Sequence, residues 1–399
     1  MPQHSTKRSL LISLFAFSFI VITTYLITLI ARGYRFDLKK GPGIKATGLL
    51  SATSTPKSAS VYINDKLFTA TDDTINLPPD EYQIKIVKDG YLPWQKTVQI
   101  KKETVFQTET QLFRSVPDLR PLTFTGALNP AASPDLSRII YAVASASAQK
   151  DNGLYLIELN DNLIPLTRNT PKLIAPNYPG IDWSKFTFAF SPDSREILAT
   201  SPSLSYLLKI DSPISQQNLF DVTPRLPLIK EEWNQQEQLN LSVKLQKLPK
   251  ELQELVSTES SQHLLFSTDE DKVLYLASKD AQIEPEIITP PPAQSTQTQT
   301  RDIKAGNYYV YDIKDDTNFF IGSSESLNSL RWLPNSNNLV FVADDKLQVV
   351  EYDNTNQHTI FAGDFKHDTV FPWTDGNKIV TLTTPYQGAS YNLFAITIR

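Results

Sequence analysis

Hydrophobic and polar residues follow two different patterns along this chain. Between Ser9 and Ala31 lies an uninterrupted apolar run of 23 residues without a charge. As a helix rising about 1.5 Å per residue, the run would measure roughly 34 Å, enough to cross a hydrocarbon core of about 30 Å. After it, apolar and polar residues alternate in short segments, which is the period-two pattern of half-buried strands. The pattern predicts one membrane anchor over residues 9–31, followed by an all-β soluble region.

The apolar run has a second interpretation, a cleaved signal peptide. The small residues Ala31 and Gly33 form a weak cleavage site. However, the apolar region of a signal peptide is about 7–15 residues long, and this run is longer. We therefore expect an uncleaved signal-anchor that crosses the cell membrane once, with residues 1–8 as a cytoplasmic tail and residues 32–45 as a juxtamembrane linker.

The charges that flank the anchor bear on its orientation in the membrane. Cations flank the run on both sides, at Lys7 and Arg8 before it and at Arg32, Arg35, Lys39 and Lys40 after it. This count favours a cytoplasmic C-terminus, but large domains translocate largely regardless of flanking charge. The chain also contains no Cys and a single Met. We expect the domains after the anchor to be extracytoplasmic, against the flank count.

Residues 46–113 have the pattern of short strands separated by turns. Ala59–Ile63 leads into Asn64-Asp65, a dipeptide whose side chains tolerate a left-handed backbone. Glu81–Val87 alternates strictly, and Val98 and Ile100 share one face of a further strand. These segments predict a small antiparallel β-sandwich without helices.

The order of the motifs in this module resembles the PEGA domain family. The matching motifs are Ser54-x-Pro56, Ala59-x-Val61-Tyr62-Ile63-Asn64, Leu77-Pro78, Tyr82-x-Ile84-x-Ile86, Lys88-x-Gly90-Tyr91-x-x-Trp94 and Val98-x-Ile100. Pro78-Pro79-Asp80-Glu81 takes the place of the motif that names the family, and we expect Asp80 to adopt the left-handed conformation of the family's turn glycine. The resemblance implies a surface-exposed β-sandwich of bacterial envelope proteins, without catalytic activity. The large rings of Tyr82, Tyr91 and Trp94 are expected to pack in its core.

Residues 114–399 contain a degenerate repeat. Each copy ends one strand, makes a turn rich in Pro, Asp or Asn, and begins a β-branched strand. The five copies are Ala132–Tyr141, Phe190–Leu198, Phe266–Tyr275, Trp332–Val340 and Trp373–Val380. A second strand follows each copy, at Gly153–Ile157, Tyr206–Ile210, Tyr308–Ile313, Leu347–Tyr352 and Tyr391–Ile396. Five such units predict a β-propeller of about five or six blades.

Two insertions lengthen the spacing of the repeats. Residues 228–256 are rich in Glu, Gln, Lys and Leu and predict a helix broken near Pro249. We expect this helical insertion to cap the propeller, since its apolar heptads are few for the alternative, a coiled-coil partner helix. Residues 284–304 contain three consecutive prolines and Gln/Thr alternation, and predict a flexible loop.

The last repeat lacks the residues for a four-stranded blade. Residues 117–125 are able to supply the missing strand by pairing with Tyr391–Ile396, which would hide an edge that otherwise pairs with other chains. The repeats resemble the WD40-like and TolB-like propeller families, with the Ser-Pro-Asp-Gly turn weakened to Ser-Pro-Asp-Leu and Ser-Pro-Asp-Ser. This resemblance concerns a structural motif, so it implies the fold and leaves the ligand open.

The sequence offers no catalytic motif. The histidines His4, His263, His358 and His367 belong to no metal-binding or nucleophile signature, and Gly is scarce at 13 residues. His358 and His367 bracket a predicted turn and are expected to be solvated, although they could share a rim. Asp269-Glu270-Asp271 lacks the pattern of a calcium loop, and a hairpin role suffices for it. We therefore predict no catalytic residue, no metal site and no cofactor, and the binding residues stay unknown.

Charge excludes a further class of partner. From residue 9 onward, acids outnumber bases by 43 to 36, whereas nucleic-acid binding calls for a basic patch. Two functions stay open. The first is a membrane-anchored, extracytoplasmic binding or scaffolding protein of the bacterial cell envelope, which holds a protein or glycan through the propeller or the PEGA-like domain. The alternative is a propeller enzyme acting on envelope polysaccharide, which needs two carboxylates about 5–9.5 Å apart.

Overall fold

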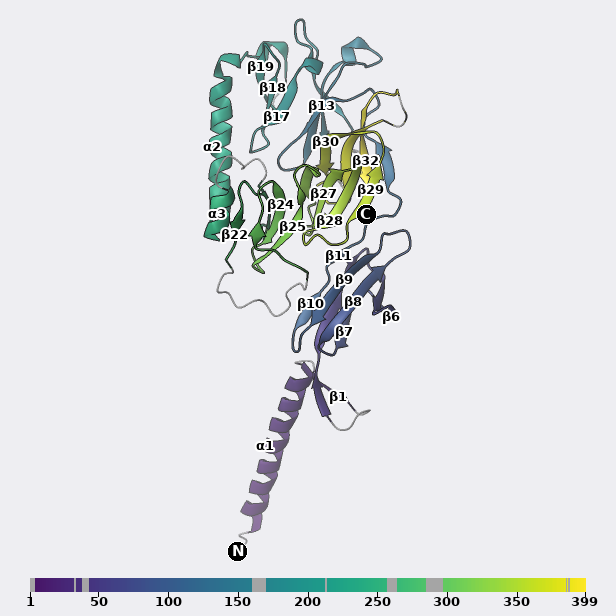
Figure 1. The fold of residues 1–399 in the computed structure, drawn as a ribbon, viewed down its shortest axis with the longest axis vertical. Coiled ribbons are helices and arrows are strands. Elements are labelled where there is room, and N and C mark those ends of the chain that lie inside the picture. The colour runs from purple at the N-terminus through teal and green to yellow at the C-terminus, as the bar shows by residue number, and fades with distance from the viewer. Residues whose placement is uncertain are drawn as a thin grey trace. The chain divides into compact units, whose positions relative to one another are not determined.

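The computed structural model describes residues 4–31, 34–37, 43–159, 170–211, 214–256, 264–284, 297–384, 386 and 388–399. Contacts divide the chain into two units (Figure 1). The first consists of Met1–Leu112 with Thr289–Gln297, and the second of Phe113–Ile288 with Thr298–Arg399.

The first unit begins with helix α1, His4–Ala31. Its segment Leu10–Leu29 is long and apolar enough to cross a membrane, and none of it is buried within the chain. The segment expected to be a linker contains a hairpin of two short strands, β1 (Tyr34–Asp37) and β2 (Gly43–Ala46), which pair antiparallel. Four-residue strands are too short to show the alternation by which the longer strands were recognised.

Strands β3 to β11 form a β-sandwich. One sheet has the order β6-β5-β8-β9, and shorter sheets have the orders β10-β3-β7 and β11-β4. The strands are β3 Gly48–Ala52, β4 Ser54–Thr55, β5 Ser60–Ile63, β6 Lys66–Ala70, β7 Asp73–Leu77, β8 Asp80–Val87, β9 Trp94–Ile100, β10 Val105–Gln107 and β11 Thr110–Gln111. Their shared core includes Leu50, Val61, Ile84, Ile86 and Trp94.

The sandwich confirms the expected turn at Asn64-Asp65 and corrects two other expectations. Asn64 and Asp65 have φ of 49° and 62°, as a tight turn between β5 and β6 requires. Asp80 instead begins strand β8 and is not among the residues with positive φ, so the predicted left-handed turn there is wrong. The sandwich is also not purely antiparallel, because β10 pairs with β3, and β11 with β4, in parallel. The long chain between these strands allows both members of each pair to run in the same direction.

Five larger sheets make up the second unit, and we call them blades 1 to 5. Blade 1 has the order β13-β14-β15-β16, blade 2 β17-β18-β19, blade 3 β20-β21-β24-β25, blade 4 β26-β27-β28-β29, and blade 5 β12-β32-β31-β30. The strands of blades 1 and 2 are β13 Leu128–Ala132, β14 Arg138–Val143, β15 Gly153–Glu158, β16 Lys172–Pro176, β17 Thr187–Phe190, β18 Glu196–Thr200 and β19 Ser205–Lys209.

The remaining strands complete blades 3 to 5. They are β20 Leu265–Phe266, β21 Lys272–Leu276, β24 Asn307–Asp312, β25 Thr317–Ser323, β26 Asn328–Trp332, β27 Asn338–Ala343, β28 Lys346–Glu351, β29 His358–Ala362, β30 Phe365–Pro372, β31 Lys378–Thr383, β32 Asn392–Thr397 and β12 Asp118–Pro121. A short pair, β22 (Ala281–Gln282) and β23 (Asp302–Ile303), precedes β24. Strand β23 lies inside the predicted flexible loop 284–304, of which residues 285–296 lie outside the described part of the chain.

The sheets are arranged as the blades of a propeller. Their first strands contact one another in the order β17, β13, β30, β26 and β20. Apolar clusters lie between blades 1 and 2, between blades 1 and 5, and between blades 3 and 4. Strand β12 pairs antiparallel with β32, so the predicted completion of the last blade by residues 117–125 is confirmed. Within the described residues, the second unit is therefore a propeller with five sheets as blades, where the repeats predicted five or six.

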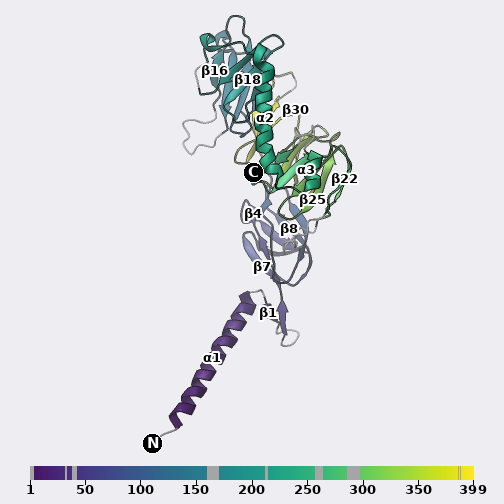
Figure 2. The same cartoon turned by 90° about the vertical axis from the view of Figure 1, so that its left-hand side faces the viewer.

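The helical insertion lies between blades 2 and 3. It forms α2 (Leu226–Leu245) and α3 (Lys250–Val256), and Figures 1 and 2 show α2 running from the blade of β18 to α3 beside blade 3. Leu252 and Leu255 of α3 are fully buried against Tyr275 and Tyr309 of blade 3. The first strands of blades 2 and 3 are β17 and β20. Among the described residues, these two strands do not make the contacts that join the first strands of the other neighbouring blades. The insertion thus covers the face of blade 3 that a preceding blade would otherwise cover.

The five repeat turns share one backbone feature. The fourth residue of each turn has a positive φ, between 58° and 69°. These residues are Leu136, Ser194, Glu270, Ser336 and Gly376. In the first three copies a serine hydroxyl donates to the aspartate two residues later, at 2.5–2.6 Å. This serine–aspartate bond organises the turn in those three copies. Four of the five turns have a residue other than glycine at the left-handed position.

Replacing Leu136 by glycine should therefore stabilise the propeller. A non-glycine residue in the left-handed region costs about 1–2 kcal/mol, and glycine removes this cost. Part of the gain is offset, because glycine loses more backbone entropy on folding than other residues do. We expect a gain of roughly 0.5–1 kcal/mol, measured by thermal melting of the full chain. Leu136→Ala is the control, because it removes the side chain and keeps the left-handed Cβ. A glycine variant no more stable than the alanine variant would contradict the argument.

Candidate functional site

A groove of about 550 Å³ opens where the loops of blades 1 and 2 meet. Three segments form it: the β14–β15 connection, the connection from β16 to β17, and the β18–β19 hairpin. The lining residues are Gln149, Asn177, Tyr178, Gly180, Ile181, Asp182, Lys185, Phe186, Ser201, Pro202, Ser203 and Leu204.

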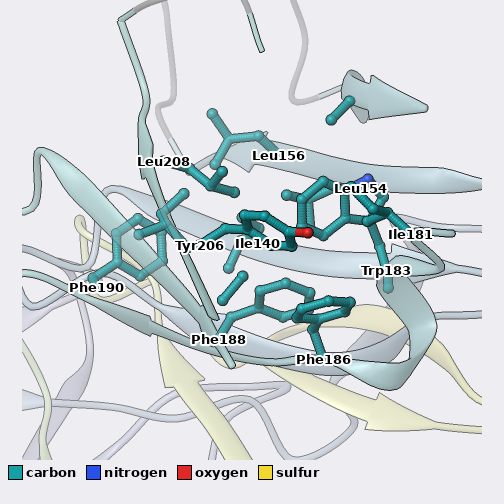
Figure 3. Packing of buried hydrophobic residues seen from close by; sticks show 14 residues of the cluster. Ile140, Leu154, Leu156, Ile181, Trp183, Phe186, Phe188, Phe190, Tyr206 and Leu208 are labelled. Atoms are coloured by element: carbon teal, nitrogen blue, oxygen red, sulfur yellow. The ribbon is translucent and has the colours of Figure 1, made fainter. Parts of the chain in front are cut away.

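An aromatic cluster supports the groove from below. Trp183 is fully buried, and its indole Nε1 donates to the carbonyl of Pro176 at 3.0 Å. Its ring packs against Phe186 and Tyr206, with centroids 5.3 Å and 6.0 Å away. Figure 3 shows these three side chains within the apolar cluster between the two blades. Phe186, which lines the groove, is thereby packed into the apolar core of blades 1 and 2.

Asp182 fixes the loop that forms one wall. Its Oδ1 accepts bonds from the Ser184 hydroxyl at 2.7 Å and from the Ser184 backbone N–H at 3.2 Å, and so caps the short helix Trp183–Lys185. Asn177 Nδ2 donates to the same oxygen at 3.3 Å. The Ser184 hydroxyl is the main reason why the pKa of Asp182 lies below its usual value. The ionised carboxylate therefore serves to position the loop.

The opposite wall is held by backbone and hydroxyl bonds. Ser201 Oγ donates to the Leu204 carbonyl at 2.9 Å and accepts from the Leu204 N–H at 3.0 Å, which closes the hairpin. In the wall that contains Asp182, Tyr178 Oη donates to the Ile214 carbonyl at 2.8 Å, and burial raises the pKa of this phenol. Gly180 has φ of +81°, so glycine suits the turn between Tyr178 and Ile181. Both walls are therefore set before any ligand arrives.

Polar groups at the rim are exposed to solvent. Gln149 and Ser203 are exposed, and the side chain of Lys185 is 76% exposed while its Nζ lies 3.7 Å from Asp182 Oδ2. An amide, a hydroxyl and an ammonium group thus line the same groove as the half-buried ring of Tyr178. Such a set is able to hold a polar ligand by hydrogen bonds and ring contact. The described lining contributes one carboxylate, Asp182, and no histidine or cysteine.

The residues considered from sequence lie elsewhere. His4 begins α1, His263 lies outside the described residues, and His358 begins β29. His367 lies in β30, with its ring 5.1 Å from that of Phe365 and its Nε2 3.4 Å from Asp345 Oδ1. Among the described residues, no group of three or more His, Asp and Glu is arranged to hold a metal ion.

The acidic run at the third repeat has the structural role expected of it. Asp269 accepts from Ser267 Oγ at 2.6 Å and from the Asp271 N–H at 3.1 Å, so it organises the turn. Glu270 lies 2.9 Å from Lys244, in the last turn of α2, and 2.9 Å from Lys247, which follows the helix. The run therefore ties the helical insertion to blade 3.

Sequence analysis missed every residue of the groove. The signal for it was the stretch Asn177–Trp183, in which Asn, Pro-Gly and Asp mark a turn between two strands. That signal predicts a loop, but the groove also needs Gln149 and the hairpin Ser201–Leu204, which only the packing of two blades brings alongside it.

Comparison with known proteins identifies the β-sandwich. Residues 47–115 match the PEGA domain. This match spans the sandwich of strands β3 to β11 and agrees with the resemblance seen in the sequence. No curated protein matches the chain.

Solved structures similar to the chain include several propellers. A putative TolB from Agrobacterium tumefaciens is 12% identical, with 86% of this chain and 99% of that chain covered and a TM-score of 0.21. A protein of unknown function from Bacteroides thetaiotaomicron is 10% identical over 91% and 100% of the two chains, with a TM-score of 0.28. The propeller domain of the trilobed protease from Pyrococcus furiosus is 12% identical over 88% and 96%, with a TM-score of 0.22. At these TM-scores the likenesses carry no argument, and the propeller rests on its own strand pairing.

Proposed function

We propose that this chain is a membrane-anchored, extracytoplasmic binding protein of the bacterial cell envelope, which holds a protein or glycan in the groove between blades 1 and 2. The PEGA domain and the propeller support an envelope-associated binding or scaffolding role. The apolar helix α1 supports a membrane anchor.

The observation that carries the proposal is the construction of the groove. Its walls and floor are fixed by internal hydrogen bonds, while Gln149, Lys185 and Ser203 face solvent at the rim. A preformed, concave and polar site is suited to binding, because little ordering is required when the ligand arrives. The alternative, an enzyme acting on polysaccharide, gains no support from this groove, since two carboxylates are needed and its described lining contributes one.

The groove can be tested by capture from an envelope extract. The full chain in detergent is compared with the double variant Gln149→Ala/Lys185→Ala, whose side chains are exposed and contribute little to folding. Loss of two polar contacts at about 1–1.5 kcal/mol each should weaken capture of the bound protein or glycan roughly 30–150-fold. Lys230→Ala/Gln236→Ala on α2 removes the same residue types at exposed positions outside the groove and should leave capture unchanged. Equal capture by both variants would show that the ligand binds elsewhere.

A further inference from the structure

A bulge in the first strand of blade 4 places two polar side chains on the same face. In the pairing of β26 with β27, Asn328 lies opposite Val342. Arg331 lies opposite Val340, and the register shifts between the two pairs. Ser329 has φ of 52° at this shift, which marks it as the extra residue of the bulge. Because Val340 and Val342 are two residues apart, they share a face, and their partners share it with them.

This face of blade 4 is turned away from blade 3. The neighbours of Arg331 in β26, Leu330 and Trp332, are buried in the apolar cluster between blades 3 and 4. Arg331 therefore projects from the opposite side of the strand. The first strand on that side is β30 of blade 5, which contacts β26 and whose His367 carbonyl accepts a hydrogen bond from Ser329 Oγ. The two polar side chains consequently lie at the junction of blades 4 and 5.

The guanidinium of Arg331 has no partner in the described part of the chain. Asn328 and Arg331 are both exposed, and neither side chain forms a hydrogen bond or an ion pair with another described residue. Burial nevertheless lowers the pKa of the guanidinium below its usual value, so protein surrounds much of a group that water still reaches. A charge that gives up hydration without gaining a partner destabilises the folded state. Arg331 is therefore not explained by the stability of the blade.

The same bulge in blade 1 contains different residues. There the register of β13 and β14 shifts between Leu128 and Ala131, and Asn129 has φ of 51°. Leu128 and Ala131 thus occupy the positions of Asn328 and Arg331, and Ala131 packs against the apolar cluster between blades 1 and 2. The bulge by itself requires neither an amide nor a guanidinium. The polar pair is a property of blade 4 that this backbone geometry does not demand.

We propose that Arg331 and Asn328 bind the carboxylate of an acidic side chain on a partner protein. A guanidinium pairs bidentately with a carboxylate, and the amide of Asn328 adds a further donor. Acids outnumber bases by 43 to 36 from residue 9 onward, so the chain repels a polyanion more strongly than a single carboxylate. A sugar acid has several hydroxyls that need partners when they leave water, whereas Glu and Asp carry one carboxylate on an apolar stem. The site is separate from the groove between blades 1 and 2 and does not depend on it.

The test is a titration of the full chain in detergent, followed by saturation-transfer NMR of the ligand. The probe is the acetylated and amidated tripeptide Ala-Glu-Ala, whose side chain is its only charge, and the reference is Ala-Gln-Ala. Hydrogen bonds between charged groups are stronger than neutral ones, so we expect roughly a tenfold preference for the Glu peptide. Salt should weaken this preference.

Matched variants assign the preference to Arg331. Arg331→Met keeps a long side chain and removes the charge, so it should abolish the preference. Arg225→Met removes another exposed arginine, before α2, and should leave the preference unchanged. Asn328→Glu supplies a carboxylate on the same face, which should pair with Arg331 and displace the peptide.

Thermal melting of the variants gives a second readout. Because an unpaired and partly desolvated charge costs stability, Arg331→Met should melt about 2–4 °C above the wild type. Asn328→Glu should melt no lower than the wild type, so it decides the binding experiment even where Arg331→Met fails to fold. Equal binding of the two peptides by the wild type would overturn the proposal. A preference that persists in Asn328→Glu and in folded Arg331→Met would overturn it as well.

Two further arms separate the partner class and the groove. Galacturonic acid replaces the peptide in one titration. Binding of galacturonic acid that depends on Arg331, without a response to the Glu peptide, would overturn the protein partner in favour of an acidic glycan. The groove variant Gln149→Ala/Lys185→Ala should retain the preference for the Glu peptide. Failure of the groove to capture a ligand and failure of this site are therefore read from different variants.

Discussion

Replacing Arg120 by proline should open the propeller at blade 5. Arg120 in β12 pairs with Ala395 in β32, and two residues later the Leu122 N–H donates to the Leu393 carbonyl at 2.8 Å. Because hydrogen-bonded pairs alternate along an antiparallel ladder, Arg120 occupies a bonded position. Proline removes its N–H and leaves an acceptor in β32 without its partner. The lost bond and the orphaned acceptor should cost about 2–3 kcal/mol and lower the Tm by roughly 5–10 °C.

The neighbouring residue provides the control for this prediction. Leu119 occupies the alternate position opposite Ile396, where the N–H points away from β32. Leu119→Pro should therefore have a much smaller effect on the Tm. The Arg120 variant should also associate in size-exclusion chromatography, since an exposed strand edge pairs with other chains. If both proline variants melt and elute alike, the β12–β32 ladder does not hold blade 5 together.

Truncating Leu252 to alanine should have the second large effect. This side chain of α3 is fully buried and packs with Val273, Tyr275 and Tyr309 of blade 3. A buried Leu→Ala change removes transfer free energy and leaves a cavity, which together cost about 2–5 kcal/mol. Guanidinium unfolding of the full chain, followed by the fluorescence of its tryptophans, measures the loss.

The same insertion supplies a matched control. Leu239 of α2 is 69% exposed. Leu239→Ala therefore removes the same atoms as Leu252→Ala, but from a side chain that faces solvent and not from a core. Its effect should stay within about 0.5 kcal/mol. Equal effects of the two changes would mean that α3 does not cover blade 3.

The repeats were predictable from sequence because their signal is local. Each turn carries Pro, Asp, Asn or Gly within a few residues, and each flanking strand alternates. The pairing of β12 with β32 was also predictable, since the last repeat lacks a strand and residues 117–125 contain an unused one. The helical insertion and its position against the propeller were expected from its composition, although the blade that it covers was not.

The features that sequence analysis missed depend on long-range contacts. Nothing near β3 indicates that β10, more than fifty residues later, pairs with it in parallel. The groove has the same cause, since Gln149, Asn177 and Ser203 meet only when blades 1 and 2 pack. Moreover, Asp182 resembles many turn aspartates, and its capping of Trp183–Lys185 gives no sequence signal of a binding site.

The pairing of β12 with β32 also constrains when the protein can finish folding. The bond from the Leu393 N–H to Thr123 Oγ1 joins residues 270 apart in the sequence. A ribosome adding about 5–20 residues per second needs roughly 14–55 s to synthesise that interval. Throughout this time β12 has been made and β32 has not. The early strand must be kept from pairing with other chains until its partner, 270 residues later in the sequence, has been translated.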